Sequence, residues 1–256
     1  MHNLPKFKSI ICAAIAAGIL LPGIACAAEE NWSGFYGGLA LGGTYGQSNP
    51  DTVSELSQYF TGDDPVVMKS RLQRTISGSA LSGSVLAGYE HTRGQMVYGI
   101  ETDISVMDYS ETSAVGPVTF NTNTTVDFNV RTTVETNFSF SIRPKIGYAV
   151  GNWMFHAAAG PSIGYFDYDF RYSDTNAGGA GNDFSKSTLA LGISSGLGSS
   201  YKLDNGWVLR GDYVMNYYPK VIDERQSFVR TGFRGSIDHQ VDFESHNVRF
   251  ALIKRF

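Results

Sequence analysis

The last ten residues of the chain, Asn247–Phe256, read NVRFALIKRF, and their alternation decides the fold. Successive side chains of a β-strand point to opposite faces, so residues two apart share a face. One face would carry Val248, Phe250, Leu252, Lys254 and Phe256. The other would carry Asn247, Arg249, Ala251, Ile253 and Arg255. The stretch therefore predicts a strand with one apolar side that stays ordered to its last residue, unlike the frayed polar end of most soluble domains.

The first 27 residues have the pattern of a signal peptide that is removed on export. Two lysines precede an apolar stretch, and small residues at Ala25 and Ala27 fit the cleavage site. A transmembrane anchor is one alternative, but it needs about 20 apolar residues, and this stretch is shorter. A lipoprotein acylated on Cys26 is another, but Gly23 stands where that signal wants a bulky aliphatic residue.

The exported chain would be acidic and free of cysteine. Both cysteines, Cys12 and Cys26, lie in the predicted signal peptide, so we expect no disulfide, no thiolate metal site and no cofactor. Removal of residues 1–27 takes away two lysines and no acid, which changes the formal charge from −4 to −6. An acidic chain without a basic block is poorly suited to nucleic acid, and we expect no nucleic-acid partner.

The alternation of the last ten residues recurs along the exported chain. It predicts eight strands, at about 35–47, 78–91, 96–109, 137–150, 153–171, 187–203, 207–218 and 243–256. The links after the second, fourth and sixth strands are short, and the last of these contains Asn205-Gly206, a strong hairpin signal. The links after the first, third, fifth and seventh strands are long and polar. Regular alternation of short and long links is typical of an antiparallel up-and-down meander.

Aromatic residues mark the short-turn end of every predicted strand. They are Phe35, Tyr89, Tyr98, Tyr148, Trp153, Tyr201, Trp207 and Phe256, all on the apolar face. A membrane interface favours rings with an apolar body and a polar tip, whereas a secreted β-sandwich has no use for such a girdle. We therefore predict that residues 28–256 form one all-β domain, an eight-stranded antiparallel transmembrane β-barrel of the Gram-negative outer membrane. Its short turns would face the periplasm and its long loops the outside.

Five segments give the chain a family resemblance. They are WSGFYGGLALGG (32–43), VYGIETD (97–103), GYAVGNWMFHAAAG (147–160), GLGSSYKLDNGWVLRGDY (196–213) and VRFALIKRF (248–256). Together they resemble the small opacity-type outer-membrane β-barrel family, often labelled porin family proteins. The resemblance implies an eight-stranded barrel that serves as an envelope component, surface antigen or adhesin. It also implies that Phe250 and Phe256 belong to a signal read by the barrel-assembly machinery. Ser200, where an acid is common, and Ala251–Lys254 depart from the family pattern.

Charged residues fall on the inward face of the predicted barrel at similar heights. They are Glu101, Asp103, Arg143, Lys145, Arg210, Asp212 and Arg249. An eight-stranded barrel is just wide enough for its inward side chains to fill it, and an unpaired ion inside it would be costly. We therefore predict that these charges pair into a plug. A narrow ion channel through them is the alternative.

The histidines give no catalytic constellation, and we predict that the protein is not an enzyme. Some small barrels transfer acyl groups with a His, a Ser and an acid on the membrane-facing wall. Ser245 and His246 are adjacent and would point to opposite faces of a strand. His156 would point inward near the turns. Glu101 and Asp103 would lie in a packed lumen, which leaves no cleft for glycoside chemistry.

By elimination, activity is predicted in the loops. The candidates for interaction, all in the loop at about 219–241, are Arg225, Phe228, Arg230, Phe233 and Arg234. Basic residues beside aromatic residues suit lipopolysaccharide phosphates or a host polyanion, so outer-membrane lipid, lipopolysaccharide and a host or cell-surface ligand are the expected partners. A solvated loop without a ligand is the alternative. A small-ligand barrel, for example for haem, is a further one, with Tyr59, His239 and His246 as scattered candidates.

The loop sequences also predict strands that continue beyond the membrane. β-branched and aromatic residues run on through residues 112–135 and 222–240, although a membrane strand needs only about 9 to 11 residues. We expect these segments to form paired ribbons that project outward, held by backbone ladder bonds and by cross-strand Thr and Phe contacts.

Overall fold

The computed structural model of the chain describes residues 31–176, 181–230 and 232–256. The predicted signal peptide, with Ala25, Ala27 and both cysteines, lies outside the described residues, and its removal stays a prediction. In the described part of the chain, no helix is long and apolar enough to cross a membrane.

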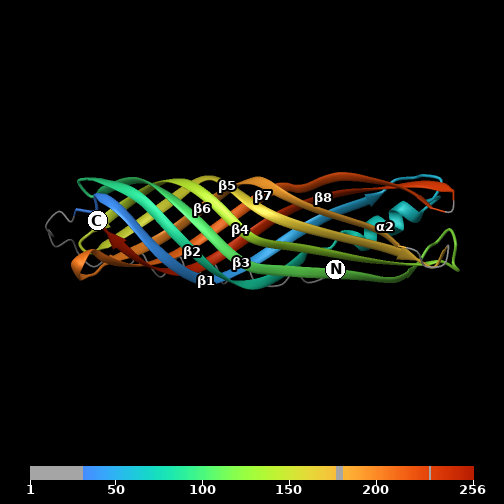
Figure 1. Cartoon of the computed structure of the whole chain (residues 1–256), viewed down its shortest axis with the longest axis horizontal. Coiled ribbons are helices and arrows are strands. Elements are labelled where there is room, and N and C mark those ends of the chain that lie inside the picture. The colour runs from blue at the N-terminus through green and yellow to red at the C-terminus, as the bar shows by residue number, and fades with distance from the viewer. Residues whose placement is uncertain (1–30, 177–180, 231) are drawn as a thin grey trace, which may run out of the picture.

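Eight antiparallel strands close into one barrel (Figure 1). They are β1 (Gly34–Ser54), β2 (Ile76–Arg93), β3 (Met96–Thr119), β4 (Asp127–Val150), β5 (Trp153–Asp174), β6 (Gly181–Lys202), β7 (Trp207–Arg230) and β8 (Phe233–Arg255). Each strand pairs with its neighbours in sequence. β1 also pairs with β8, from Tyr36 opposite Arg255 to Ser54 opposite Ile237, and this pairing seals the barrel. The predicted fold, an eight-stranded up-and-down barrel, is confirmed.

The links at one end of the barrel are tight turns, as the sequence predicts. Two residues join β2 to β3, and two join β4 to β5. Between β6 and β7, the single-turn 3₁₀ helix η2 (Asp204–Gly206) makes the turn. Asn205 and Gly206 have φ values of 58° and 74° there, the left-handed conformation for which Asn-Gly is favoured in hairpins.

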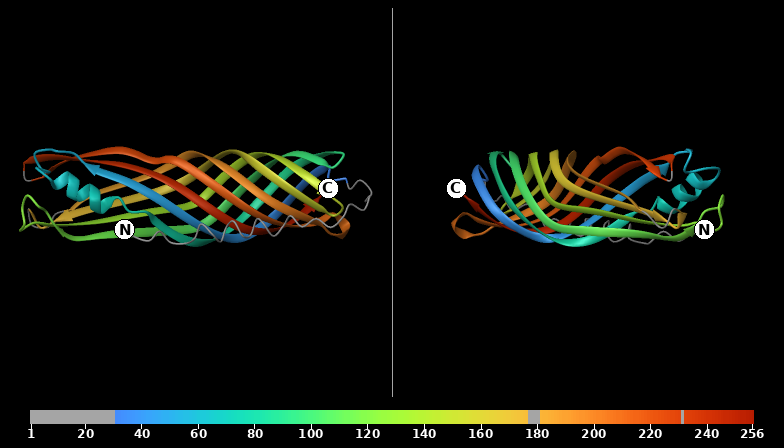
Figure 2. Two further views of the ribbon diagram at one scale, coloured as in Figure 1. Left: turned by 180° about the vertical axis from the view of Figure 1, so that it is seen from behind. Right: turned by 45° about the vertical axis from the view of Figure 1, so that its right-hand side comes forward.

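The link between β1 and β2 contains a helix, α2 (Asp64–Leu72), that the sequence analysis did not predict (Figure 2). Pro65 lies in its first turn, where a missing N–H costs nothing, and Asp64 there suits the positive end of the helix dipole. Met68 and Leu72 are buried on one side of the helix. α2 is therefore an amphipathic cover at the end of the barrel opposite to the turns.

The strands exchange their apolar face partway along their length, and β5 shows this most clearly. Near the turns its outward residues are Trp153, Phe155, Ala157, Ala159, Pro161, Ile163 and Tyr165, and its inward residues are mostly small or polar. Beyond Tyr165 the outward residues are Asp167, Asp169, Arg171 and Ser173, and the inward ones are Phe166, Tyr168, Phe170 and Tyr172. The first part suits a wall in lipid and the second a wall in water. The exchange places the outer edge of the lipid near Tyr165.

The part of the barrel beyond this exchange is here called the head, meaning the described residues of 46–80, 107–137, 166–188 and 218–245. Its interior is one apolar core, to which the largest contributors are Phe60, Met68, Tyr109, Phe128, Phe166, Tyr168, Phe170, Tyr172, Tyr218 and Phe243. The strands thus continue beyond the membrane, as the sequence predicts. At this end every strand extends further than the bounds predicted for it. The predicted paired ribbons are confirmed: β3 pairs with β4 as far as Thr119 opposite Asp127, and β7 pairs with β8 as far as Arg230 opposite Phe233. The apolar core that these extended strands share was not predicted.

Backbone pairing in the head is interrupted at two places. β2 and β3 pair only as far as Ser82 opposite Met107, and β6 and β7 only as far as Ile193 opposite Tyr217. The head therefore consists of two sheets, one from β7, β8, β1 and β2 and the other from β3, β4, β5 and β6, with the core between them. We call the gap between residues 181–192 of β6 and 218–230 of β7 the β6–β7 seam.

Helix α2 fills the first of these interruptions. Gln73, which follows the helix, donates from Nε2 to Asp51 Oδ1 on β1 at 2.6 Å. At the other end, Thr122 in the tip of the β3–β4 hairpin donates to Asp64. The helix therefore spans from β1 to the β3–β4 tip, across the place where β2 and β3 part.

Candidate functional site

Glu101 on β3 is the centre of a charge network in the lumen. Its carboxylate is fully buried and accepts hydrogen bonds from Arg143 Nη2 at 2.9 Å, Arg210 Nη2 at 3.0 Å and Tyr36 Oη at 2.7 Å. Lys145 Nζ lies 3.8 Å from the same carboxylate. Several cations thus surround one acid, and the ion is compensated as its burial requires.

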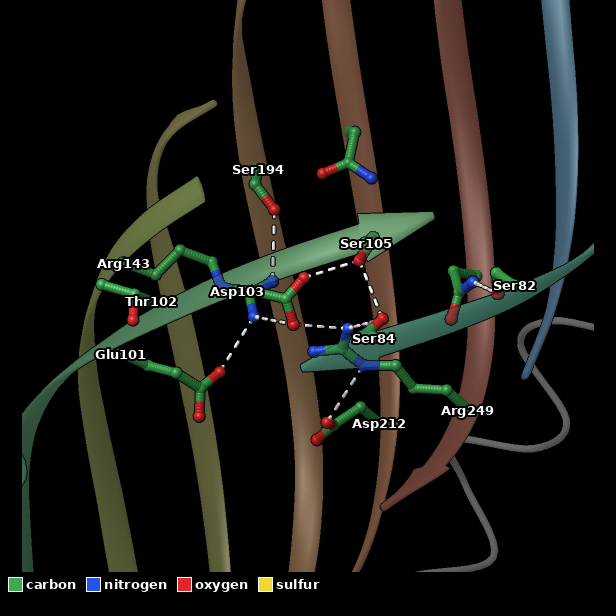
Figure 3. Close-up of polar contacts among 12 residues, drawn as sticks. Ser82, Ser84, Glu101, Thr102, Asp103, Ser105, Arg143, Ser194, Asp212 and Arg249 are labelled. Carbon is green, nitrogen blue, oxygen red and sulfur yellow. Dashed lines mark hydrogen bonds and ion pairs between the residues drawn. The ribbon is translucent and has the colours of Figure 1, made fainter. Parts of the chain in front are cut away.

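Asp103 and Asp212 are two further centres of the network. Asp103 lies between two arginines, with Oδ2 at 3.6 Å from Arg143 Nη2 and 2.6 Å from Arg249 Nη1 (Figure 3). Asp212 accepts from Arg210 Nε at 2.7 Å and lies 3.4 Å from Arg249 Nε. The structure thus places all seven residues of the predicted lumen network in one buried cluster. Their function as a plug stays a prediction.

The sequence analysis left three residues out of this network. Glu90 lies 2.8 Å from Lys145 Nζ and 2.5 Å from Arg255 Nη1, and His156 Nε2 lies 3.2 Å from Asp212. Glu90, His156 and Arg255 all belong to the inward face of their strands. Counting by twos to the ends of the strands would therefore have included them.

The lumen is filled on both sides of the charges. Toward the turns, Trp32 is fully buried in an apolar cluster that includes Tyr36, Leu86 and Ile253. Toward the head, serine and asparagine side chains line a small polar cavity with room for about one water molecule. The aromatic core of the head follows. Within the described residues, side chains therefore occupy the lumen from Trp32 to α2.

The residues of the predicted girdle surround the barrel at its turn end. Phe35, Tyr89, Tyr98, Tyr148, Trp153, Trp207 and Phe256 are exposed on the outer face, and Tyr201 is half-buried. Lys254 Nζ lies over the Trp207 ring, 5.2 Å from its centre. Phe250 is also exposed, on the same outward face of β8 as Leu252, two residues earlier in the chain. This placement suits a membrane interface, and that role remains an expectation.

The structure separates the five residues predicted for interaction. Phe233 and Arg234 are exposed at the end of the β7–β8 hairpin. Arg225 is exposed too, but it contacts Glu55 and lies 3.0 Å from Asp238, so acids already occupy its guanidinium.

Phe228 and Arg230 face the interior of the head. Arg230 Nη1 lies 3.1 Å from Asp174 Oδ2, which also accepts from Tyr172 at 2.6 Å and from Tyr59 at 2.5 Å. Phe228 packs edge-on against the Tyr59 ring at 5.4 Å. Burial and the Asp174 carboxylate raise the pKa of Tyr59 and of Tyr172 above its ordinary value, so both stay neutral donors. This cluster joins the two sheets of the head and leaves Phe228 and Arg230 unsuited to an external ligand.

Exposed apolar side chains return at the far end of the head. Leu56, Val229 and Phe233 are all more than half exposed there, outside the lipid-facing band. Val229 pairs with Arg234 across the β7–β8 hairpin. The chain after β1 runs beside them, since Tyr59 N donates to Arg234 O at 3.1 Å. We call Leu56, Val229, Phe233 and Arg234 the apex patch.

The residues considered for a catalytic or haem site do not converge. Ser245 is buried in the lumen, whereas His246 lies on the outer wall. There His246 Nδ1 is 2.5 Å from Tyr213 Oη and Nε2 is 2.8 Å from Glu244 Oε1, a contact that the sequence analysis did not foresee. His239 is buried inside the head, away from the outer wall that carries His246.

Comparisons with known proteins identify a family. The sequence matches the family model described as "Outer membrane protein beta-barrel domain" over residues 13–248. No curated protein matches it. Among solved structures, the outer membrane protease OmpT of Escherichia coli aligns at 7% identity with a TM-score of 0.49, covering 91% of this chain and 99% of OmpT. OprG of Pseudomonas aeruginosa aligns at 13% identity with a TM-score of 0.44, covering 88% and 97%.

A third solved structure is the attachment invasion locus protein Ail of Yersinia pestis, in complex with the heparin analogue sucrose octasulfate. It aligns at 9% identity with a TM-score of 0.34, covering 86% of this chain and 99% of Ail. The family match extends over nearly the whole chain and agrees with the closed eight-stranded barrel and its apolar outer band. The chain belongs to the outer membrane protein beta-barrel domain family, and it is a β-barrel of the Gram-negative outer membrane.

Proposed function

We propose that this protein is a non-conducting, non-enzymatic barrel that anchors a preorganised head in the outer membrane and presents it for interaction. The observation that supports this most is the filling of the lumen. An apolar cluster around Trp32, the charge network around Glu101 and the aromatic core of the head follow one another along the axis. A narrow ion channel is less well supported, because an ion would have to displace paired charges and then cross an apolar core.

Single-channel recording on refolded protein in planar bilayers tests the absence of conduction. We expect no steady conductance steps from the wild-type protein. Arg143→Ala and Asp212→Ala serve as variants that open the charge network. Steady steps in the wild type that either variant abolishes would show that the charges line a conducting path, and the proposal would be lost.

The apex patch is the surface we propose for interaction. Exposed apolar side chains that gather in one place on a part of the protein that lies in water are typical of interaction surfaces. Arg234 lies among them and is exposed, whereas Arg225 is held by acids and Arg230 is buried. An apolar surface with one free guanidinium suits an amphiphilic anion or an anionic surface, such as lipopolysaccharide or a host polyanion.

Binding of the protein in nanodiscs to immobilised lipopolysaccharide and to immobilised heparin tests the apex patch. We expect Phe233→Ser and Arg234→Gln each to weaken binding about tenfold, because each removes about 1 to 2 kcal/mol of contact. Val66→Ser is the control, since Val66 is an apolar residue on α2 that is at least as exposed as Phe233 and is not one of the patch residues. Equal losses for Phe233→Ser and Val66→Ser would mean that the patch is not the binding surface.

A second experiment tests the same proposal in cells. The head segments are transferred onto an unrelated eight-stranded barrel, and the adhesion of cells that carry this barrel is measured.

A further inference from the structure

Among the described residues, the β6–β7 seam is bridged by side-chain contacts and not by a backbone ladder. Lys186 Nζ on β6 lies 3.0 Å from Glu224 Oε1 on β7 at the surface. Gln226 on β7 donates from Nε2 to the backbone oxygen of Asp183 on β6 at 3.0 Å. The other neighbouring strands of the head are joined by backbone ladders, except for β2 and β3, where α2 covers the gap. The seam is therefore the place where the wall of the head can part with the fewest broken hydrogen bonds.

His239 on β8 lies beneath this seam. Its imidazole is fully buried and stacks on the Phe184 ring of β6, with parallel planes and centres 5.0 Å apart. The Phe170 ring meets it edge-on at 4.4 Å. Phe184 reaches His239 past β7, with which this part of β6 does not pair. The stack thus ties β6 to β8 on the inner side of the seam.

The environment of His239 suits only its neutral form. Nδ1 lies 3.2 Å from Tyr168 Oη, and Nε2 has no hydrogen-bond partner among the described residues. The rings of Tyr168, Phe170 and Phe184 contact it. Its cross-strand partners in the backbone register are Thr52 on β1 and Glu224 on β7. The other polar groups on the neighbouring strands are Lys186 on β6, Gln226 on β7 and, through Tyr168, Thr132 on β4. Burial among them lowers the pKa of His239 to about 4.

A proton on His239 would place a cation in this apolar stack. Both ring nitrogens would then be donors, and Tyr168 accepts from only one of them, so the second N–H would be buried without an acceptor. Glu224 is the cross-strand partner of His239 on β7. Its carboxylate is engaged by Lys186, so pairing with His239 would cost the ion pair that spans the seam.

We propose that protonation of His239 opens the head along the β6–β7 seam. At neutral pH the stack and the Lys186–Glu224 pair keep the seam closed. In acid, His239 moves toward water and Glu224, the contact with Phe184 is lost, and β6 separates from β7. The membrane-embedded wall stays closed, because its backbone ladder between β6 and β7 is intact. This inference does not depend on what the apex patch binds.

Amide hydrogen exchange on the full exported chain in nanodiscs tests the proposal. The segments to follow are residues 182–192 and 218–230, with rates corrected for the intrinsic pH dependence of exchange. If His239 has a pKa of about 6.5 in the open state and about 4 in the closed state, linkage predicts an increase in opening of about 60-fold from pH 7.0 to pH 4.5. Residues 98–106 and 140–148 in the membrane wall should show no such increase.

His239→Phe is the decisive variant, because it keeps an aromatic ring in the stack and cannot be protonated. It should stay protected at both pH values, while His246→Gln, on the same strand but outside the core, should open like the wild type. A wild type whose exchange changes less than threefold, or a His239→Phe protein that opens as the wild type does, would overturn the proposal. If His239→Phe does not fold, a reducible bifunctional thiol cross-linker between Lys186→Cys and Glu224→Cys gives a second test. It should abolish the acid response until a reductant is added, and a response that persists in the cross-linked protein would contradict the proposal.

Discussion

A single side chain can determine the stability of a lumen as narrow as this one. Glu101 is shared by Arg143, Arg210 and Lys145, and each of these cations has one further acid beside it. A buried ion pair adds little stability when compared with an apolar pair of the same shape. Neutralising Glu101 is costly all the same, because three buried cations then lose one compensating negative charge.

At this scale we predict that Glu101→Gln lowers the free energy of unfolding by about 3 to 5 kcal/mol. Urea unfolding of the refolded protein in detergent, followed by the shift of the folded band on electrophoresis, measures the loss. Asp108→Asn is the control, because Asp108 is exposed on the same strand, and it should change the stability by less than about 0.5 kcal/mol. Equal unfolding midpoints for Glu101→Gln and the wild type would refute a network centred on Glu101.

At the scale of elements, the end of β8 both closes the barrel against β1 and carries the proposed signal for the assembly machinery. Phe256 N donates to Phe35 O at 2.9 Å, so the last residue of the chain is bonded to the first strand of the barrel. We predict that Phe256→Ala leaves the protein exported but poorly assembled, since it removes a ring of the girdle and part of the proposed signal for the assembly machinery. The amount of heat-modifiable protein in the outer-membrane fraction measures this. Phe233→Ala, at the other end of β8, should assemble normally, and normal assembly of both variants would argue against the prediction.

The elements also show where sequence reasoning reached its limit. The lipid-facing halves of the strands follow one alternation, and the girdle at Tyr98 or Trp207 could be found by counting. Near Tyr165 the apolar residues of β5 pass to the other face. A search for an outward apolar face loses its signal there, so it does not reveal the inward aromatic core of the head. Phe228 and Arg230 were assigned to a loop for the same reason. The short α2 carries only Met68 and Leu72 as a buried pair, which is too little for a helical pattern.

The lumen was predictable in composition and not in pairing. Counting by twos identifies Arg143 and Asp212 as inward, because a strand has only two faces. Which acid meets which base depends on the stagger between strands, and the stagger is a property of the closed barrel. The contact between Arg210 on β7 and Glu101 on β3 crosses the lumen and joins strands far apart in sequence, so no local pattern reveals it.

At the scale of the whole molecule, the exchange of faces divides the barrel into a part made for lipid and a part made for water. We predict that an outward arginine will be costly in the first part and tolerated in the second. Ile142→Arg, on the outer face of β4 within the lipid band, should lower the free energy of unfolding by about 2 to 4 kcal/mol. Asn129→Arg, outward on the same strand in the head, should have almost no effect. Unfolding in lipid vesicles measures both, and equal effects would misplace the membrane boundary.

The position of the exchange of faces also sets how far the head projects above the membrane. β5 continues nine residues past Tyr165 to Asp174. At about 3.3 Å per residue and a tilt of about 40°, this lifts the end of the head roughly 23 Å above the lipid headgroups. The apex patch thus stands clear of the bilayer, and a large partner can touch it without approaching the bilayer. Two surfaces joined through this protein would be held apart by at least that distance, which makes the barrel a spacer as well as an anchor.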